Sequence, residues 1–212
     1  MKLQQFIMLV AITLLVGLGS AYAAEKLTTP TESLNGLRPG TLTLGDLTTK
    51  YGKPAVTDKG SLLKLYGGSA DSTLYGWFMV ENPNYTVPDL AVETAKGSDR
   101  IDLVMAIGYD GLKTEKGVAC FDSEARMLEV YGKPDFVFAV PMDGFVLREF
   151  YYVKLGISFD VAPVNQAGDR QIVAIYVTYP EFLTRAIDLR KQYIRDGTGQ
   201  DITSRYQGGI AI

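Results

Sequence analysis

The four residues Tyr-Gly-Lys-Pro occur twice in the chain, at positions 51–54 and again 80 residues later at 131–134. Each copy follows a segment whose apolar residues recur at helical spacing. Glycine just past a helix adopts the positive φ that ends many helices, and the proline two residues on cannot continue the helix. The repeat therefore predicts two short helices that end at Tyr51 and Tyr131, in a fold that uses one unit twice.

An alternation of apolar and polar residues follows each predicted helix and indicates β-strands. In the first copy the expected strands lie near residues 62–66, 73–80, 90–94 and 101–107, and in the second near 136–140, 145–153, 156–161 and 171–179. A longer amphipathic helix is expected after Pro180, because proline suits a first helical turn. We expect an α+β fold of two tandem repeats, each a short helix followed by a four-stranded antiparallel meander, plus a C-terminal helix.

The first residues have the three parts of a secretion signal. A positive charge at Lys2 precedes an apolar run from Phe6 to Leu18, and small residues follow at Ala21 and Ala23. We expect cleavage after Ala23 and a mature protein in the periplasm or outside the cell, with no stable membrane span after cleavage. A retained anchor is the alternative, which the run disfavours because a span needs roughly 20 residues.

The expected boundaries follow from these patterns. They are a signal peptide at 1–23, a linker rich in Thr and Ser at 24–36, a first repeat at 37–111, a second repeat at 112–180, and a C-terminal helix with a flexible tail at 181–212.

The composition excludes several classes of function. The 24 acidic residues against 21 basic ones give a net charge of −3 and leave no clustered basic face for nucleic acid. The chain has no histidine and a single cysteine, Cys120, which argues against Ser-His-Asp hydrolysis, the common zinc sites and an internal disulfide. We expect Cys120 to be a small buried side chain, and we expect no cofactor or metal.

The second copy carries a pattern that resembles a known fold. Gly117-Val118 precede a short capped helix, Tyr-Gly-Lys-Pro is followed by Asp135, and the meander ends in an aromatic-rich strand. This arrangement resembles the tandem-repeat fold of the β-lactamase inhibitor proteins, and is similar to the SmpA/OmlA envelope lipoproteins, whose repeat opens with a helix ending in L-G-x-P. The resemblance covers roughly residues 37–180 in two copies. It implies a protein that binds other proteins and does no chemistry.

A binding or assembly module of the cell envelope is the first functional hypothesis, with another envelope or secreted protein as its partner. Its binding face would be the free face of the repeated sheet, at Tyr75, Trp77, Arg148 and Tyr152. Aromatic and arginine side chains dominate binding hot spots, which is why these four are chosen. The competing interpretation of each aromatic is a core residue under the helices.

Two other functions stay open. One is an inhibitor of a secreted enzyme, by analogy with the fold, although fold does not transfer function. The other is a hydrolase that uses paired carboxylates, but their spacing singles out no pair. The candidates are Asp99, Asp102, Asp110, Asp122, Glu124, Asp143, Glu149 and Asp160.

Overall fold

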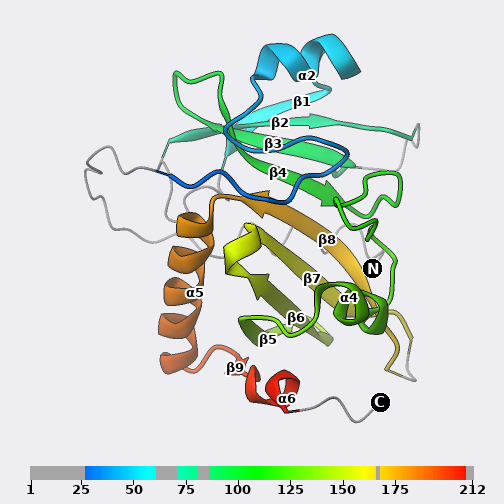
Figure 1. The fold of residues 1–212 in the computed structure, drawn as a ribbon, viewed down its shortest axis with the longest axis vertical. Coiled ribbons are helices and arrows are strands. Elements are labelled where there is room, and N and C mark those ends of the chain that lie inside the picture. The colour runs from blue at the N-terminus through cyan, green and yellow to red at the C-terminus, as the bar shows by residue number, and fades with distance from the viewer. Residues whose placement is uncertain (1–26, 61–70, 81–85, 166–167, 209–212) are drawn as a thin grey trace.

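The structure is a computed structural model that describes residues 27–60, 71–80, 86–165 and 168–208. Its centre is one antiparallel sheet of nine strands in the order β1-β2-β3-β4-β8-β7-β6-β5-β9 (Figure 1). The strands are β1 (Val56–Gly60), β2 (Ser72–Trp77), β3 (Leu90–Ala95), β4 (Ile101–Ile107), β5 (Phe136–Met142), β6 (Phe145–Tyr152), β7 (Ile157–Pro163), β8 (Arg170–Thr178) and β9 (Gln200–Asp201). The α+β fold class is confirmed.

Four α-helices and one 3-10 turn accompany the sheet in the described residues. They are α2 (Leu44–Tyr51), α4 (Glu124–Tyr131), η1 (Val153–Leu155), α5 (Pro180–Arg195) and α6 (Ser204–Gln207). Side-chain oxygens of Thr43 and Ser123 accept backbone N–H groups in the first turns of α2 and α4, as N-caps do. None of these helices is long and apolar enough to cross a membrane.

The sheet consists of two runs of sequential pairing that meet side by side. Strands β1 to β4 pair in chain order, and so do strands β5 to β8. The two runs join where β4 pairs antiparallel with β8, from Leu103↔Thr178 to Ile107↔Ala174. The last strand of each run therefore lies at the centre of the sheet, which leaves β1 at one edge and β5, extended by the short β9, at the other.

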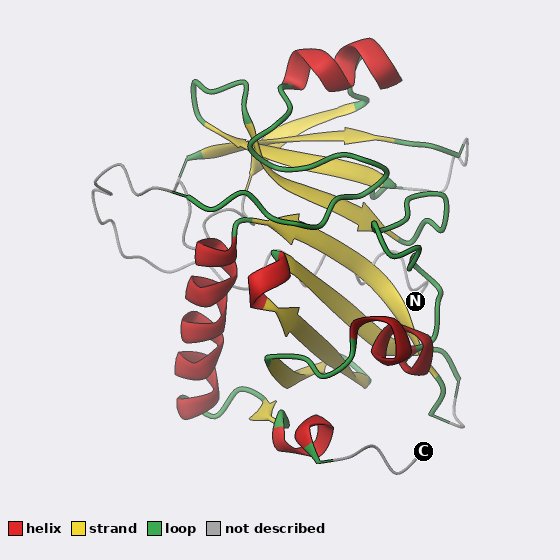
Figure 2. Cartoon of the chain, in the orientation of Figure 1, coloured by secondary structure: helices red, strands yellow, loops and turns green. Residues whose placement is uncertain are grey.

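Both faces of the sheet carry a core. On the first face, here called the α4 face, the residues buried with those of α2, α4 and α6 include Trp77, Phe150 and Phe159. On the second, the α5 face, residues such as Phe138 and Tyr151 pack with α5. Figure 2 shows α5 running along the β5–β8 half, and α2 and α4 placed on opposite halves of the sheet. The aliphatic and aromatic residues thus alternate between two covered faces, as period two requires.

The segment before α2 is packed, and the prediction of a simple linker at 24–36 is wrong for its described part. Residues 30–38, here called the strap, cross the α4 face near β4 and β8 (Figure 1). Leu34 and Ser33 are buried, and the Glu32 N–H donates to the carbonyl of Leu155 at 3.2 Å. Leu34 also bridges to Thr114. The segment packs on the sheet because burying the apolar side chain of Leu34 is favourable.

The end of the chain differs from the expected flexible tail as well. Residues 196–208 form β9, which pairs with β5, and α6, whose Tyr206 is buried against Phe150. Strand β1 at Val56–Gly60 was not predicted, and the expected strand at 62–66 falls outside the described residues. The predicted signal peptide at 1–23 falls outside them too.

Candidate functional site

Two of the four predicted binding residues are core residues. Trp77 is 3% exposed and its Nε1–H donates to the carbonyl of Gly52 at 2.9 Å. Tyr152 is 4% exposed and its hydroxyl donates to the carbonyl of Gly132 at 3.0 Å. Each aromatic side chain thus ties a strand to the glycine that ends a helix. The prediction that Trp77 and Tyr152 lie on a free binding face is therefore wrong.

The other two residues are accessible in part. Tyr75 on β2 is half-buried and packs against the α4-face core. Arg148 on β6 donates from Nη1 to both carboxylate oxygens of Glu124, at 2.8 and 3.0 Å, and to the Tyr206 hydroxyl at 2.9 Å. Four strands lie between β2 and β6 in the sheet. The structure therefore does not bring the four residues together.

A different accessible surface lies at the end of the β5–β8 half, on the α4 face beyond α4. It consists of Pro141, Val146, Pro163 and Arg170, here called the rim. Pro141 pairs with Val146 across β5 and β6, and Pro163 pairs with Arg170 across β7 and β8. The Arg170 Nη1–H donates back to the Val146 carbonyl at 2.9 Å, so the row is continuous. Val146 is 41% exposed.

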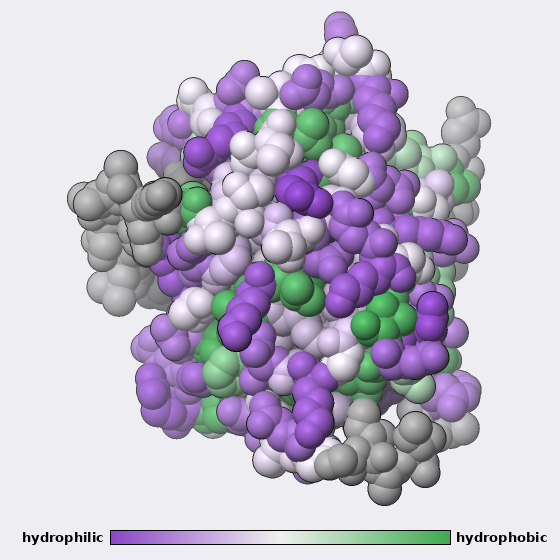
Figure 3. Space-filling model, in the orientation of Figure 1, coloured by the Kyte–Doolittle hydropathy of each residue, from purple (hydrophilic) through white to green (hydrophobic). Residues whose placement is uncertain are grey.

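Arg170 is the charged member of the rim. Its pKa is lowered, first by partial burial and then by the nearby charge of Arg148. Glu124 and Tyr206 act on it in the opposite direction, so Arg170 lies within electrostatic reach of the Arg148–Glu124–Tyr206 group. Figure 3 shows hydrophobic residues interspersed among hydrophilic ones on this face of the molecule. The rim thus combines an apolar row with a cation.

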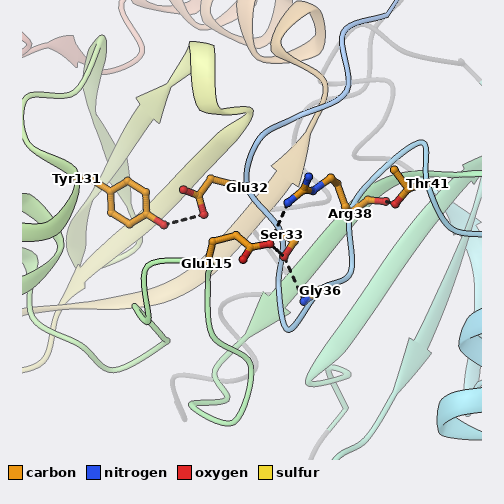
Figure 4. Close-up of polar contacts among 7 residues, drawn as sticks. All are labelled: Glu32, Ser33, Gly36, Arg38, Thr41, Glu115 and Tyr131. Carbon is orange, nitrogen blue, oxygen red and sulfur yellow. Dashed lines mark hydrogen bonds and ion pairs between the residues drawn. The ribbon is translucent and has the colours of Figure 1, made fainter.

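A second polar group lies where the strap meets α4 (Figure 4). The Tyr131 hydroxyl donates to Glu32 Oε2 at 3.1 Å, and Glu32 is 3% exposed. Desolvation raises the pKa of Glu32, while the Tyr131 hydrogen bond and the charge of Lys116 oppose the rise. The Lys116 ammonium also lies 4.7 Å from the centroid of the Tyr131 ring. These contacts hold the strap to α4.

The neighbouring contacts in Figure 4 hold the strap to the loop before α4. The Ser33 hydroxyl donates to Glu115 Oε1 at 2.5 Å and accepts the Gly36 N–H at 3.1 Å. Arg38 Nη2 donates to the same Glu115 oxygen at 3.0 Å. The hydrogen bonds from Ser33 and Arg38 lower the pKa of Glu115. All of these polar atoms have protein partners, which indicates a fastening rather than an open site.

A third polar group is covered by α5. Glu149 on β6 and Asp160 on β7 lie directly opposite each other. Arg190 on α5 donates from Nε to Glu149 Oε2 at 2.8 Å and from Nη2 to Oε1. The Tyr176 hydroxyl donates to Asp160 Oδ2 at 2.9 Å, and the Tyr151 hydroxyl to Glu149 Oε2 at 3.1 Å. Both carboxylates are among the eight candidates predicted from the sequence, but their pairing was not predicted.

The Asp160 carboxyl of this group has a raised pKa. Asp160 keeps part of its surface exposed, but the packed surroundings desolvate its carboxyl and raise its pKa to about 8. The charge of Glu149 adds to the rise. A carboxyl with a raised pKa can act as a general acid, but the same effect arises in structural ion pairs. Here Arg190 occupies both oxygens of Glu149.

Cys120 is 1% exposed, which confirms the prediction of a buried side chain. Desolvation raises the pKa of its thiol to about 11, so it is a weak nucleophile. Among the residues that the structure describes, no group of three or more histidine, cysteine, aspartate or glutamate side chains could hold a metal ion.

Sequence reasoning missed Glu32, Arg170 and Arg190 as members of polar groups. Their partners lie far away in the chain, as the separation of 99 positions from Glu32 to Tyr131 illustrates. Comparison with protein-family models, with curated proteins and with solved structures finds no match. A function for the chain can therefore be inferred only from its own sequence, its polar groups and the rim.

Proposed function

We propose that the chain is an exported, non-catalytic protein-binding or assembly module of the cell envelope, and that the rim is its binding face. The observation that carries this proposal is the distribution of exposed apolar side chains. Of the four large ones in the described residues, three lie at the rim end of β5–β8: Phe121, Val146 and Val164. Larger exposed apolar patches with polar borders mark protein-interaction sites.

Phe121 has a second property that supports this end of the sheet. It has a φ of 71° although it is not glycine, and it is 45% exposed. Its N–H donates to the Ile172 carbonyl at 2.8 Å, two residues from Arg170. An aromatic residue held in the left-handed region and exposed to water is strained without gaining burial, and such strain clusters at functional positions.

The proposal includes a repeated architecture, supported by pairs of corresponding contacts. The Ile101 N–H donates to Leu42 and the Ile172 N–H donates to Asp122, at 3.1 and 2.9 Å. Bridges join Thr43 to Arg100 and Ser123 to Gln171. The residues before the helices in these pairs are 80 positions apart, as are the two Tyr-Gly-Lys-Pro copies. We propose two copies of one helix-plus-meander unit, similar to the repeat of the β-lactamase inhibitor proteins.

The export and the absence of catalysis belong to the same proposal. Export rests on the signal pattern at 1–23, with the mature protein in the periplasm or outside the cell. The lack of catalysis rests on the chain having no histidine and on Arg190 and α5 covering the paired carboxylates. A carboxylate whose two oxygens are bonded to Arg190 under α5 is not free to meet a substrate.

The test compares two exposed valines in the mature chain, residues 24–212. Val146→Gln removes an apolar side chain from the rim, and Val80→Gln removes one of similar exposure, 50%, elsewhere. A partner captured from envelope extract is purified and titrated by calorimetry against the wild type and both variants. We expect at least tenfold weaker binding for Val146→Gln and unchanged binding for Val80→Gln.

Equal effects of the two variants would contradict the rim as the binding face. Circular dichroism of both variants separates lost binding from lost folding. Where the partner is an enzyme, its activity in the complex distinguishes an inhibitor from an assembly module, since only an inhibitor lowers that activity.

A further inference from the structure

We infer that Arg170 selects the partner by binding a carboxylate on an acidic, apolar segment of a protein. This inference rests on the proposed function and names the chemistry of its binding face. Arginine suits the role because its planar guanidinium forms two parallel hydrogen bonds with a carboxylate. The argument concerns the charges around the rim, the free hydrogen-bonding capacity of Arg170, and the apolar surface beside it.

The charges next to Arg170 leave one positive charge without compensation. Arg148 and Glu124 form an ion pair at 2.8 Å, and both also contact the Tyr206 hydroxyl. Glu124 therefore already balances Arg148. Arg170 makes no ion pair with any described residue, and desolvation together with Arg148 lowers its pKa. A half-buried cation in that state gains from an anion supplied by another molecule.

The remaining acidic side chains near the rim accept hydrogen bonds from other groups or are exposed to solvent. Asp169 accepts from the Asn165 amide at 2.8 Å within the β7–β8 turn. Asp122 accepts the Ala119 N–H at 2.9 Å in the turn before α4. Asp143 is exposed in the β5–β6 turn. None of them neutralises Arg170 in the described structure, although their negative field extends over the surface.

Arg170 has unused donors that point to a ligand. A guanidinium has five N–H groups, and within the described residues Arg170 donates a hydrogen bond from Nη1 to the Val146 carbonyl. The side chain runs from β8 past Pro163 to reach β6. Its guanidinium therefore lies directly beside the apolar row. An acidic residue flanked by aliphatic ones matches this pairing of a cation with apolar neighbours.

The same surroundings disfavour a phosphate or a membrane as the occupant. One uncompensated charge matches one carboxylate, whereas a phosphate dianion would also meet the field of Glu124, Asp122, Asp143 and Asp169. Membrane surfaces bind through several basic residues, each contributing a small attraction. The net charge of −3 opposes such binding. A protein segment remains the occupant that fits both features.

The probe is a phage-displayed library of random ten-residue peptides selected on the immobilised mature protein. The strongest binder is synthesised together with its amide counterpart, in which each Asp or Glu becomes Asn or Gln. Both peptides are titrated against the wild type, Arg170→Gln, Arg170→Lys and Val146→Gln. Arg126→Gln is the matched control, because Arg126 lies exposed on α4 in a pair with Glu129.

We expect acidic residues among the selected peptides and at least tenfold weaker binding of the acidic peptide to Arg170→Gln. Arg170→Lys should bind at an intermediate level, because it keeps the charge and loses the two parallel bonds. The amide counterpart should bind the wild type and Arg170→Gln equally. Arg126→Gln should bind the acidic peptide as the wild type does.

The outcomes separate this inference from the proposed function. Peptides that depend on Val146 but not on Arg170 overturn the carboxylate assignment and leave the rim as a binding face. A selection that gives no peptide dependent on either residue overturns both. Arg170-dependent flotation with phosphatidylglycerol vesicles, or Arg170-dependent binding of inorganic phosphate, in place of an acidic peptide replaces the protein segment with the other anion.

Discussion

Helices α2 and α4 both end at the tyrosine of a Tyr-Gly-Lys-Pro tetrapeptide, but they bury different numbers of side chains. Both are followed by a glycine at positive φ, 81° at Gly52 and 72° at Gly132, whose N–H donates to the carbonyl four residues earlier. Helix α2 buries Leu47 alone, whereas α4 buries Met127 and Tyr131. The local sequence thus determines where each helix ends, and distant segments determine how far it is covered.

The strap accounts for this difference. Tyr131 is 8% exposed and bonded to Glu32, which comes from the strap. Tyr51, its counterpart on α2, is half-buried, with its ring centroid 6.4 Å from that of Trp77. Two identical tetrapeptides therefore occupy different surroundings because one extra segment covers only one of them. The comparison predicts unequal responses to equal substitutions in the two halves.

The largest expected effect is in the cores of the two halves. Phe159 pairs with Phe150, and Val92 pairs with Tyr75, in matching places on the α4 face, and both are 0% exposed. Phe159→Ala should lower the free energy of unfolding by about 4 kcal/mol, and Val92→Ala by about 2.5 kcal/mol, through lost burial and cavities. Urea titrations measure both.

The same titrations test whether the halves unfold together. Trp77 fluorescence reports the β1–β4 half, and circular dichroism reports the whole sheet. Coincident transitions are expected in both variants, because β4 and β8 join the halves in one sheet. Separate transitions in Phe159→Ala would show that the β4–β8 pairing does not couple them.

A smaller effect on stability is expected from Asp160, one of the paired carboxylates under α5. Its effect depends on pH and is confined to the β5–β8 half. The pKa of Asp160 is about 8 in the folded protein, above its ordinary value, so the unfolded chain releases this proton first as pH rises. The free energy of unfolding should therefore fall between about pH 4 and pH 8. Asp160→Asn should remove this dependence and be more stable than the wild type by about 2 kcal/mol at pH 8.

Thermal unfolding at several pH values measures the Asp160 effect, with the exposed Asp169→Asn as the control. A wild-type pH profile that the Asp160→Asn substitution leaves unchanged would show that Asp160 is ionised in the folded protein at neutral pH.

The smallest expected effect compares the two tyrosines of the repeated tetrapeptide. Tyr131→Phe removes the donor to the buried Glu32 carboxyl and should destabilise the protein by about 1.5 kcal/mol. Tyr51→Phe should change stability by less than about 0.5 kcal/mol, since its hydroxyl has no hydrogen-bond partner in the described residues. Equal values would mean that the strap does not stabilise α4.

Local patterns predicted much of the secondary structure. The glycine and proline of each tetrapeptide determine the ends of α2 and α4, and Pro180 stands at the start of α5. The strand alternation gave most of β2 to β8 to within a few residues. Strand β1 was not predicted because Thr57, Asp58 and Lys59 are exposed, and an edge strand without a buried face lacks the apolar alternation.

The candidate site could not be predicted in the same way. Trp77 and Tyr152 were chosen for their residue types, but burial depends on what covers a strand, and helices from other parts of the chain cover these two. Val146 shares a face of β6 with the buried Phe150, yet it is 41% exposed. Arg170 becomes distinctive only because Glu124 pairs with Arg148 instead. These relations exist between elements and have no local signature.

The strap also has a consequence for the order in which the protein can assemble. It is synthesised before the rest of the described chain, yet its contacts are with Thr114, Glu115, Tyr131 and Leu155. Contacts between residues so far apart in sequence close late and fold slowly. The strap therefore cannot form these contacts until the second half of the chain has been synthesised. We therefore expect the strap to close over α4 only after the second half of the sheet has formed.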